Sequence, residues 1–261
     1  MTESYRFLLY NIRYGTGTGW KFHTPVPFSG YMRKSSGVFF EIADFVKSFS
    51  PDIVGLIEVD GGSVRADRVN QAEKLASDLG HYFVFETKYE KPILTRFAPI
   101  VRRQGNAILV KTTILNQKYH YFEWGTKRLI IEIELENVVL FLVHLSVNFR
   151  NRRKQLIQLS RLINSIEKPV VVGGDFNVFL GQRELRRFLA ATKLKSANTF
   201  NMMTYPSRKP RWELDFIFHS DTIQAHRVHV PSVRLSDHLP LICDFSIINR
   251  GREDTSIWKP G

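Results

Sequence analysis

Several apolar segments of this chain end on a carboxylate, an amide or an imidazole. Residues 170–177 read VVVGGDFN, in which three β-branched residues and two glycines lead to Asp175 and Asn177. Runs of this kind are typical of buried strands, and a buried strand end accepts an unpaired carboxylate only at a high cost in free energy. The same pattern ends LLYN at Asn11, VGLIE at Glu58 and VLFLVH at His144.

Three further polar residues lie beside apolar runs near the end of the chain. Asp215 lies within WELDFIF, and Asp237 and His238 precede the last run in LSDHLPL. Each alone has an ordinary explanation, because Asp and Asn form turns and a core histidine usually has a hydrogen-bond partner. If the polar residues of all six apolar runs were unrelated, each run would need its own buried hydrogen-bond partner. One shared site satisfies all of them, and this is the arrangement that we predict.

The hydrophobic periodicity predicts a layered α/β or α+β domain. Strands mixed with a few helices favour two or more packed layers. We expect one catalytic domain over residues 1–248, a long loop at 15–30 and a flexible tail at 249–261. For Asn106 we favour a turn residue over a residue that lines the cleft. The expected strands are 5–12, 52–59, 81–87, 105–111, 128–136, 138–146, 170–176, 213–220 and 240–247, and the expected helices are 38–50, 69–80, 150–166 and 183–192.

The positive charge of the chain is concentrated in one stretch. The formal net charge is +12, and residues 145–215 contain 14 Lys/Arg against 5 Asp/Glu, a surplus of nine. Such a block suits a polyanionic partner: nucleic acid, an acidic membrane surface or a phosphorylated metabolite. A solvated basic face that only maintains solubility explains the charge equally well.

The sequence contains no disulfide framework and no membrane-spanning run. It has one cysteine, Cys243, and its longest near-pure apolar run is VVLFLV at 138–143, far shorter than a transmembrane helix needs. The first residues also lack the pattern of a signal peptide. We therefore expect a soluble cytoplasmic protein, with peripheral contact to an anionic membrane left open and no prediction of oligomeric state.

The residue types at the predicted site favour a hard divalent cation. The carboxylates and amides supply oxygen ligands, and no cysteine pair or histidine cluster at zinc spacing accompanies them, so Mg²⁺ or Mn²⁺ is favoured over zinc. Such an ion beside two histidines suits phosphoester hydrolysis. The glycines of GGDFN allow substrate or neighbouring backbone to approach closely. On an extended chain, Asp175 and Asn177 would point to the same side.

The ordered set of motifs resembles the endonuclease/exonuclease/phosphatase superfamily, which includes pancreatic-type DNases, apurinic-site endonucleases, deadenylases, sphingomyelinases and inositol polyphosphate phosphatases. The motifs are YNIRYG, IVGLIEVD, GNAILV, LVHLS, GGDFNVF, LDFIF and SDHLPL, and they span nearly the whole chain. The resemblance implies a four-layer α/β/β/α sandwich with two central, mostly antiparallel sheets and an active site at one rim.

The resemblance also implies a metal centre that uses Mg²⁺ or Mn²⁺. Glu58 matches the principal metal-binding glutamate, and Asn11 matches an asparagine near the metal and the phosphate. Asp237 resembles a second metal ligand. Arg13 stands where apurinic-site endonucleases have an acid, and LDFIF lacks the cysteine and arginine of the inositol phosphatases. These departures weaken assignment to either branch.

Five residues match the catalytic group of the superfamily. Asp175 resembles the aspartate that orients or deprotonates the attacking water, and Asn177 the amide that holds the phosphate or that aspartate. His238 resembles the histidine that contacts the phosphate or takes the proton, with Asp215 as its orienting carboxylate. His144 matches a second histidine that donates to the phosphate. Which group is the general base stays open.

These features predict a metal-dependent phosphoesterase and, within that class, favour a phosphodiesterase, with three hypotheses for its role. The surplus of positive charge favours a nuclease. An alternative is a phospholipid or phosphoinositide headgroup hydrolase at a membrane surface, motivated by the aromatic segment 20–28 with Trp20 and Phe22. A third hypothesis is a non-catalytic binding module that retains the fold for partner recognition.

Overall fold

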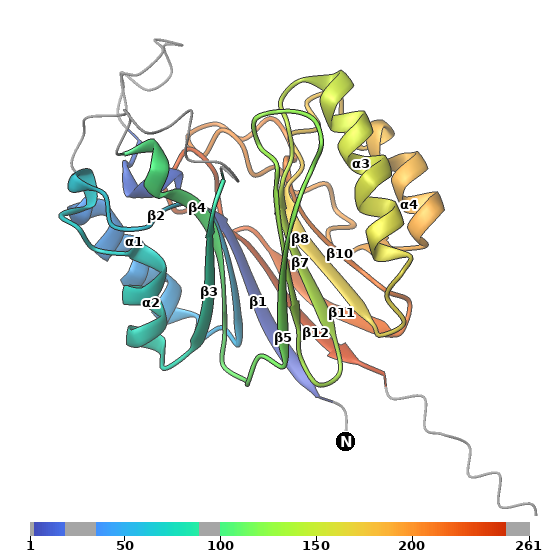
Figure 1. Cartoon of the computed structure of the whole chain (residues 1–261), viewed down its shortest axis with the longest axis horizontal. Helices are drawn as coiled ribbons and strands as arrows, with labels where there is room; N and C mark the ends of the chain where they lie inside the picture. The colour runs from blue at the N-terminus through green and yellow to red at the C-terminus, as the bar shows by residue number, and fades with distance from the viewer. Residues whose placement is uncertain (1–2, 19–34, 89–99, 249–261) are drawn as a thin grey trace, which may run out of the picture.

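The computed structural model describes residues 3–18, 35–88 and 100–248. Two six-stranded sheets pack face to face, and helices cover their two outer faces (Figure 1). The sandwich predicted from the sequence is confirmed. The segment with Trp20 and Phe22 and the predicted tail at 249–261 lie outside the described residues. No helix within these ranges is long and apolar enough to cross a membrane.

Both sheets have the same pattern of strand directions. The first sheet has the order β11-β12-β1-β2-β4-β3 and the second β5-β6-β7-β8-β10-β9. Each has one parallel pair, β1–β2 or β7–β8, among antiparallel neighbours. The strands are β1 Ser4–Asn11, β2 Ile53–Asp60, β3 Tyr82–Thr87, β4 Gln104–Val110, β5 Asn116–Tyr121, β6 Leu129–Glu134, β7 Val139–His144, β8 Val170–Asp175, β9 Lys195–Ser196, β10 Asp215–His219, β11 Ile223–His229 and β12 Leu241–Ile247.

Four α-helices lie within the described residues, two over each sheet (Figure 1). Helices α1 and α2 cover the first sheet, and α3 and α4 cover the second. Asn70 caps α2, and Asn148 caps α3, through side-chain oxygens that accept backbone N–H groups of the first turn. The helices are α1 Ser36–Ser48, α2 Gln71–Leu79, α3 Phe149–Ile163 and α4 Arg186–Thr192, with short 3₁₀ helices η1 Arg13–Gly15, η3 Val64–Ala66, η5 Val101–Arg103 and η6 Gln182–Leu185.

The two faces of the central strands are both buried. In β1, Phe7 and Leu9 pack in the core between the sheets, whereas Leu8 and Tyr10 pack with α1 and α2. This alternation places residues 7–10 of the strand against apolar neighbours on both faces. A strand that is buried on both faces reads as a continuous apolar run rather than an alternating one, as YRFLLYN does.

The two glycines of GGDFN allow close packing of the protein against itself. A Cβ atom on Gly173 would lie 2.7 Å from the ring of Phe7, which comes from the opposite sheet. A Cβ atom on Gly174 would lie 2.3 Å from the carbonyl oxygen of Val143 in the adjacent strand β7. Of the two alternatives predicted from the sequence, neighbouring backbone accounts for Gly174, whereas a side chain from the opposite sheet accounts for Gly173.

The parallel pairs determine where the polar strand ends meet. Parallel strands end at the same edge of a sheet, and in the β7–β8 register His144 lies opposite Asp175. The antiparallel strand β10 begins at this edge, with Asp215 opposite Asp175. In the first sheet, β1 ends at Asn11, which lies opposite Ile57, the residue before Glu58. Strand pairing therefore brings these side chains to one rim.

Candidate active site

Asp175 is at the centre of a buried cluster of hydrogen-bond donors. Its Oδ2 atom accepts a hydrogen bond from Nδ2 of Asn11 at 3.2 Å and lies 3.2 Å from Nε2 of His144. Its Oδ1 atom accepts from the backbone N–H of Asn177 at 3.0 Å. Burial alone would raise the pKa of this carboxyl, but His238 and His144 together lower it. Asp175 is therefore ionised at neutral pH.

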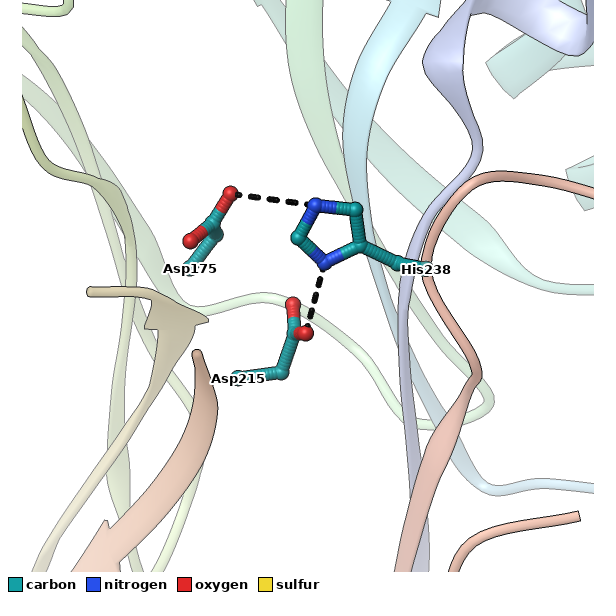
Figure 2. Close-up of side chains that lie close together, drawn as sticks. All are labelled: Asp175, Asp215 and His238. Atoms are coloured by element: carbon teal, nitrogen blue, oxygen red, sulfur yellow. Dashed lines mark hydrogen bonds and ion pairs between the residues drawn. The ribbon is translucent and has the colours of Figure 1, made fainter. Parts of the chain in front are cut away.

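His238 lies between two carboxylates (Figure 2). Its Nδ1 atom donates to Oδ2 of Asp215 at 2.7 Å, and its Nε2 atom lies 3.8 Å from Oδ2 of Asp175. The hydroxyl of Thr204 donates to the same Asp215 oxygen at 2.6 Å. Burial would lower the pKa of His238, but Asp215 and Asp175 raise it to about 10. The imidazole is therefore protonated at neutral pH, and the ring of Tyr205 packs 4.8 Å from it, centroid to centroid.

His144 has the opposite electrostatic environment. It is buried, and the ammonium group of Lys127 contacts its Nε2 atom. Burial and Lys127 lower the pKa of His144 to about 4, although Asp175 opposes that shift. The two histidines of the site therefore differ in charge at neutral pH, one neutral and one cationic.

Glu58 lies near the end of β2, where the ladder to β4 is irregular between Leu56 and Val59. Its backbone N–H donates to Oδ1 of Asn106 at 3.2 Å. Asn106 is buried within β4, so the prediction that it is a turn residue was wrong. Because the irregular ladder leaves the N–H of Glu58 without a strand partner, the Asn106 amide takes that place.

The Glu58 carboxylate lies in a strongly positive environment. The ammonium group of Lys88 is 3.7 Å from its Oε1 atom, and the Glu58 side chain is 18% exposed. Burial would raise the pKa of Glu58, but Lys88, Lys127 and His144 lower it to about 2. Burial lowers the pKa of Lys88 to about 8 despite Glu58. Lys88 also contacts the hydroxyl of Tyr14.

Asn177 is oriented differently from the prediction. Its φ is 51°, so the chain turns after β8 and the side chains of Asp175 and Asn177 do not follow an extended alternation. The Asn177 amide instead donates through Nδ2 to the carbonyl of Leu145 at 3.0 Å. This bond ties the segment after β8 to the segment after β7. Arg13, Tyr14 and Glu58 also have left-handed backbone, which is costly for residues other than glycine and concentrates at functional sites.

Asp237 is connected to the site through its contacts with Arg13 and Ser236. Oδ2 of Asp237 lies 3.4 Å from the guanidinium of Arg13. The hydroxyl of Ser236 donates to the carbonyl of Asn11 at 2.7 Å and approaches Oδ1 of Asp237 at 3.2 Å. Among the contacts of the described residues, none joins Asp237 directly to Glu58. Asn11 lies between the Asp175 cluster and the segment that carries Asp237.

The donor set fits a divalent cation that prefers oxygen. Glu58, Asp237 and the amide of Asn11 offer hard oxygen ligands, and the first two are partly exposed. A second group of possible ligands, Asp175, Asp215 and His238, has donor atoms within 4.8 Å of one another. Two of these atoms are already paired, Nδ1 of His238 with Oδ2 of Asp215. The Glu58 group offers oxygen atoms alone, whereas the second group includes an imidazole nitrogen, and oxygen ligands are those that Mg²⁺ and Mn²⁺ prefer.

Comparison with known proteins identifies the family. The model of the endonuclease/exonuclease/phosphatase family matches residues 8–238. The chain belongs to this family. The match spans Asn11 through His238, so every residue of the site lies within it. The resemblance stated from the sequence motifs is confirmed, and members of the endonuclease/exonuclease/phosphatase family hydrolyse phosphoester bonds.

Solved structures of other family members have the same fold. A family protein of Bacteroides thetaiotaomicron superposes with a TM-score of 0.69 at 14% identity, covering 95% of this chain and 99% of that one. The human Nocturnin catalytic domain with bound sulfate gives 0.67 at 20% identity, covering 94% and 97%. A mannosyl-6-phosphatase of Bacteroides thetaiotaomicron VPI-5482 gives 0.67 at 15% identity, covering 92% and 99%. No curated protein matches the sequence.

Four residues of this family member's site were not predicted from its sequence. Lys127 precedes β6, and Lys88 follows β3. Thr204 and Tyr205 lie in the segment between β9 and β10. None of the four ends an apolar run, so the pattern that led to the other site residues gives no signal for them.

Proposed function

We propose that this protein is a metal-dependent phosphodiesterase that cleaves nucleic acid by in-line attack of water on phosphorus. The observation that carries the proposal is the juxtaposition of an ionised Asp175 and a protonated His238, with Oδ2 of Asp175 lying 3.8 Å from Nε2 of His238. This separation exceeds hydrogen-bond length. Asp175 can therefore bind a water molecule while His238 binds a phosphoryl oxygen.

Asp175 orients the attacking water in this scheme. Its lowered pKa makes it a weak proton acceptor at equilibrium but a strong hydrogen-bond acceptor. Asn11 and the backbone of Asn177 hold its two oxygens in place. A fixed carboxylate reduces the entropy that the attack would otherwise cost.

His238 donates a hydrogen bond to the phosphoryl group or gives its proton to the leaving oxygen. Asp215 fixes the orientation of the imidazole and stabilises its charge, and Thr204 fixes Asp215 in turn. His144 accepts a hydrogen bond from the ammonium group of Lys127 through Nε2, so it holds Lys127 as a second cationic donor at the phosphate. Groups that are already oriented toward developing charge stabilise the transition state without reorganisation.

Glu58, Asn11 and Asp237 would hold the metal. When bound there, Mg²⁺ or Mn²⁺ offsets the negative charge of the phosphoryl oxygens. Glu58 is ionised at neutral pH because its pKa is lowered to about 2. Its carboxylate is therefore available to a cation without prior loss of a proton.

The basic surface supports nucleic acid as the substrate, because residues 145–215 contain 14 Lys/Arg against 5 Asp/Glu. A second candidate function is phosphomonoester hydrolysis. Lys88 beside Glu58 and Lys127 beside His144 add two positive charges at the site. These charges suit the dianion of a terminal phosphate better than the monoanion of a diester.

A substrate panel with Mg²⁺ or with EDTA tests these assignments. It contains single-stranded and duplex DNA and RNA, 5′- and 3′-phosphorylated oligonucleotides, phosphoinositide vesicles and bis-p-nitrophenyl phosphate. We expect metal-dependent chain cleavage of a nucleic acid that His238→Ala abolishes. The matched control is His219→Ala, which removes a buried histidine at the other end of β10.

Each other result of the panel corrects the proposal in a defined way. Release of phosphate from oligonucleotide ends without chain cleavage would assign the second candidate function instead. Turnover of the phosphoinositide vesicles alone would assign the headgroup hydrolase. The absence of any turnover would favour a non-catalytic binding module.

A further inference from the structure

The outer face of the α3 and α4 layer carries a cluster of exposed cations. The two segments 149–163 and 182–192 contain one acid, Glu184, and its Oε2 atom pairs with the buried Arg152 at 2.6 Å. None of the exposed cations forms an ion pair with a described residue. These residues, which we name the α3–α4 basic face, are Arg150, Arg153, Lys154, Arg161, Arg183, Arg186 and Arg187.

The helix geometry places these side chains together. With 100° between successive residues of a helix, Arg150, Arg153, Lys154 and Arg161 fall within an arc of about 100° on α3. Leu156, Leu159 and Ile163 of α3 are buried on the side facing the second sheet. Helix α4 lies beside α3 over that sheet (Figure 1). The exposed cations of both segments therefore belong to two neighbouring elements of the layer that covers the second sheet.

The fold accounts for one of these cations, Lys154, whose ammonium group lies 4.6 Å from the centroid of the Trp124 ring. Arg150, Arg153 and Lys154 lie in the first turns of α3, which contain no acid. A cation near a helix N-terminus costs about 0.3–1 kcal/mol, and like charges three or four residues apart repel each other. Arg152 differs, because it pairs with Glu184 and donates to the carbonyls of Ser146 and Val147 at 2.9 and 2.8 Å.

The α3–α4 basic face begins at the rim that carries the active site. Helix α3 starts five residues after His144, and η6 starts five residues after Asn177. Arg152 connects the two segments, because it binds carbonyls of the loop after β7 and the carboxylate of Glu184 in η6. A polymer held at the site therefore has a direct path onto this surface.

We propose that the α3–α4 basic face binds the sugar-phosphate backbone of the nucleic-acid strand that enters the active site. The choice of nucleic acid rests on the proposed function. Six of the seven cations are arginines, whose planar guanidinium binds phosphate in a bidentate manner. The face suits a membrane less well, because the apolar stripe of α3 points inward and the large apolar residues that this helix exposes are Phe149 and Ile157, beside four cations.

Binding is measured directly, with EDTA present to prevent cleavage. The anisotropy of fluorescent single-stranded and duplex oligonucleotides is titrated with protein at several salt concentrations. Arg153→Gln/Arg161→Gln removes two charges from the face. Lys111→Gln/Arg227→Gln removes the same number from exposed positions elsewhere, directly after β4 and within β11 of the first sheet. Circular dichroism confirms that both double variants are folded.

We expect the Arg153→Gln/Arg161→Gln variant to bind at least about tenfold more weakly at low salt. For this variant, the magnitude of the slope of log K against the log of salt concentration should decrease by roughly 1.4–1.8, because each lost phosphate contact removes about 0.7–0.9 from that magnitude. The control variant should change the slope far less. Equal losses in the two variants would overturn the proposal, since net charge would then explain the binding. Loss of phosphatidylserine vesicle binding with unchanged oligonucleotide binding would overturn it as well.

The outcome is separable from the proposed function. Suppose that strand binding depends on salt and is weakened in the Arg153→Gln/Arg161→Gln variant, but no cleavage follows when Mg²⁺ is restored. This result would contradict the nuclease and still support the α3–α4 basic face as a binding surface. If the wild type cleaves nucleic acid but the Arg153→Gln/Arg161→Gln variant binds the strand as tightly as the wild type, the nuclease would be supported and the assignment of the α3–α4 basic face would be contradicted.

Discussion

The Nδ1 atom of His238 lies 2.7 Å from Oδ2 of Asp215, in a buried pair at the rim of the sandwich. The second nitrogen of the same imidazole lies 3.8 Å from Oδ2 of Asp175. Two carboxylates outweigh the effect of burial and raise the pKa of His238 to about 10. His238 is therefore a hydrogen-bond donor across the physiological pH range.

Replacing Asp215 with asparagine should move the alkaline limit of activity to lower pH. The folded pKa of His238 is raised, so the protonated form persists below about 10 and is lost above it. Removing the Asp215 charge lowers that pKa. The pH profile of kcat/KM for bis-p-nitrophenyl phosphate measures the shift. An Asp215→Asn profile with an unchanged alkaline limb would contradict the assignment of His238 as the donor.

Replacing Lys88 with methionine should tighten metal binding and weaken substrate binding. The ammonium group lies 3.7 Å from Oε1 of Glu58 and competes with a cation for that carboxylate. We expect Mn²⁺ to bind about threefold to tenfold more tightly, as measured by calorimetry without substrate. The KM for a phosphorylated oligonucleotide should rise. Weaker Mn²⁺ binding by Lys88→Met would show that Lys88 supports the carboxylate rather than competing for it.

Replacing Gly173 with alanine should destabilise the sandwich by about 1–3 kcal/mol. The new methyl group would lie 2.7 Å from the ring of Phe7 in the opposite sheet. Gly37→Ala is a suitable control, because a Cβ atom there has no neighbour within 4 Å and alanine in helix α1 should stabilise by about 0.4–1 kcal/mol. Urea unfolding measures both variants. Equal stability of Gly173→Ala and the wild type would contradict the packing described for the two sheets.

Replacing Glu213 with glutamine should change how stability depends on pH. Burial raises the pKa of Glu213 to about 7, although Gln182 donates to it. A raised carboxyl pKa means that the folded protein retains a proton which the unfolded chain releases near pH 4.5. Stability therefore falls as pH rises from about 4.5 to about 7, and Glu213→Gln should remove this part of the fall.

The melting temperature of Glu213→Gln minus that of the wild type should become more positive between pH 5 and pH 8. The control is Glu134→Gln. Its carboxyl pKa is lowered by Lys168, so Glu134 stays ionised over this range and the difference should stay constant. Parallel pH profiles for Glu213→Gln and the wild type would refute the protonation of Glu213 in the folded state.

The layers of the fold could be predicted because most strands are buried on at least one face. The apolar runs that form β1, β2, β7 and β8 were all predicted as strands. Strands β5 and β11 were not predicted, because both lie at sheet edges and are largely exposed. Their sequences, NQKYHY and IQAHRVH, are mostly polar, and main-chain pairing with one neighbour holds them in place.

The candidate site could be predicted where chemistry coincides with a strand end. Asn11, His144 and Asp175 end their strands, so an apolar run points to each of them. The backbone conformation of Glu58 and Asn177 could not be predicted, because a positive φ depends on tertiary contacts such as the bond from Glu58 to Asn106. Lys88 and Lys127 lie outside the apolar runs, and only the fold brings them to the site.

The most direct test of the account is the turnover of bis-p-nitrophenyl phosphate by the wild type and by Asp175→Asn, with Mg²⁺ and with EDTA. Asparagine keeps the size of the side chain but removes the charge that orients water and faces His238. The account predicts turnover that requires metal and falls by about 10³-fold or more in Asp175→Asn. Turnover that persists in EDTA, or that Asp175→Asn retains at the wild-type rate, would contradict it.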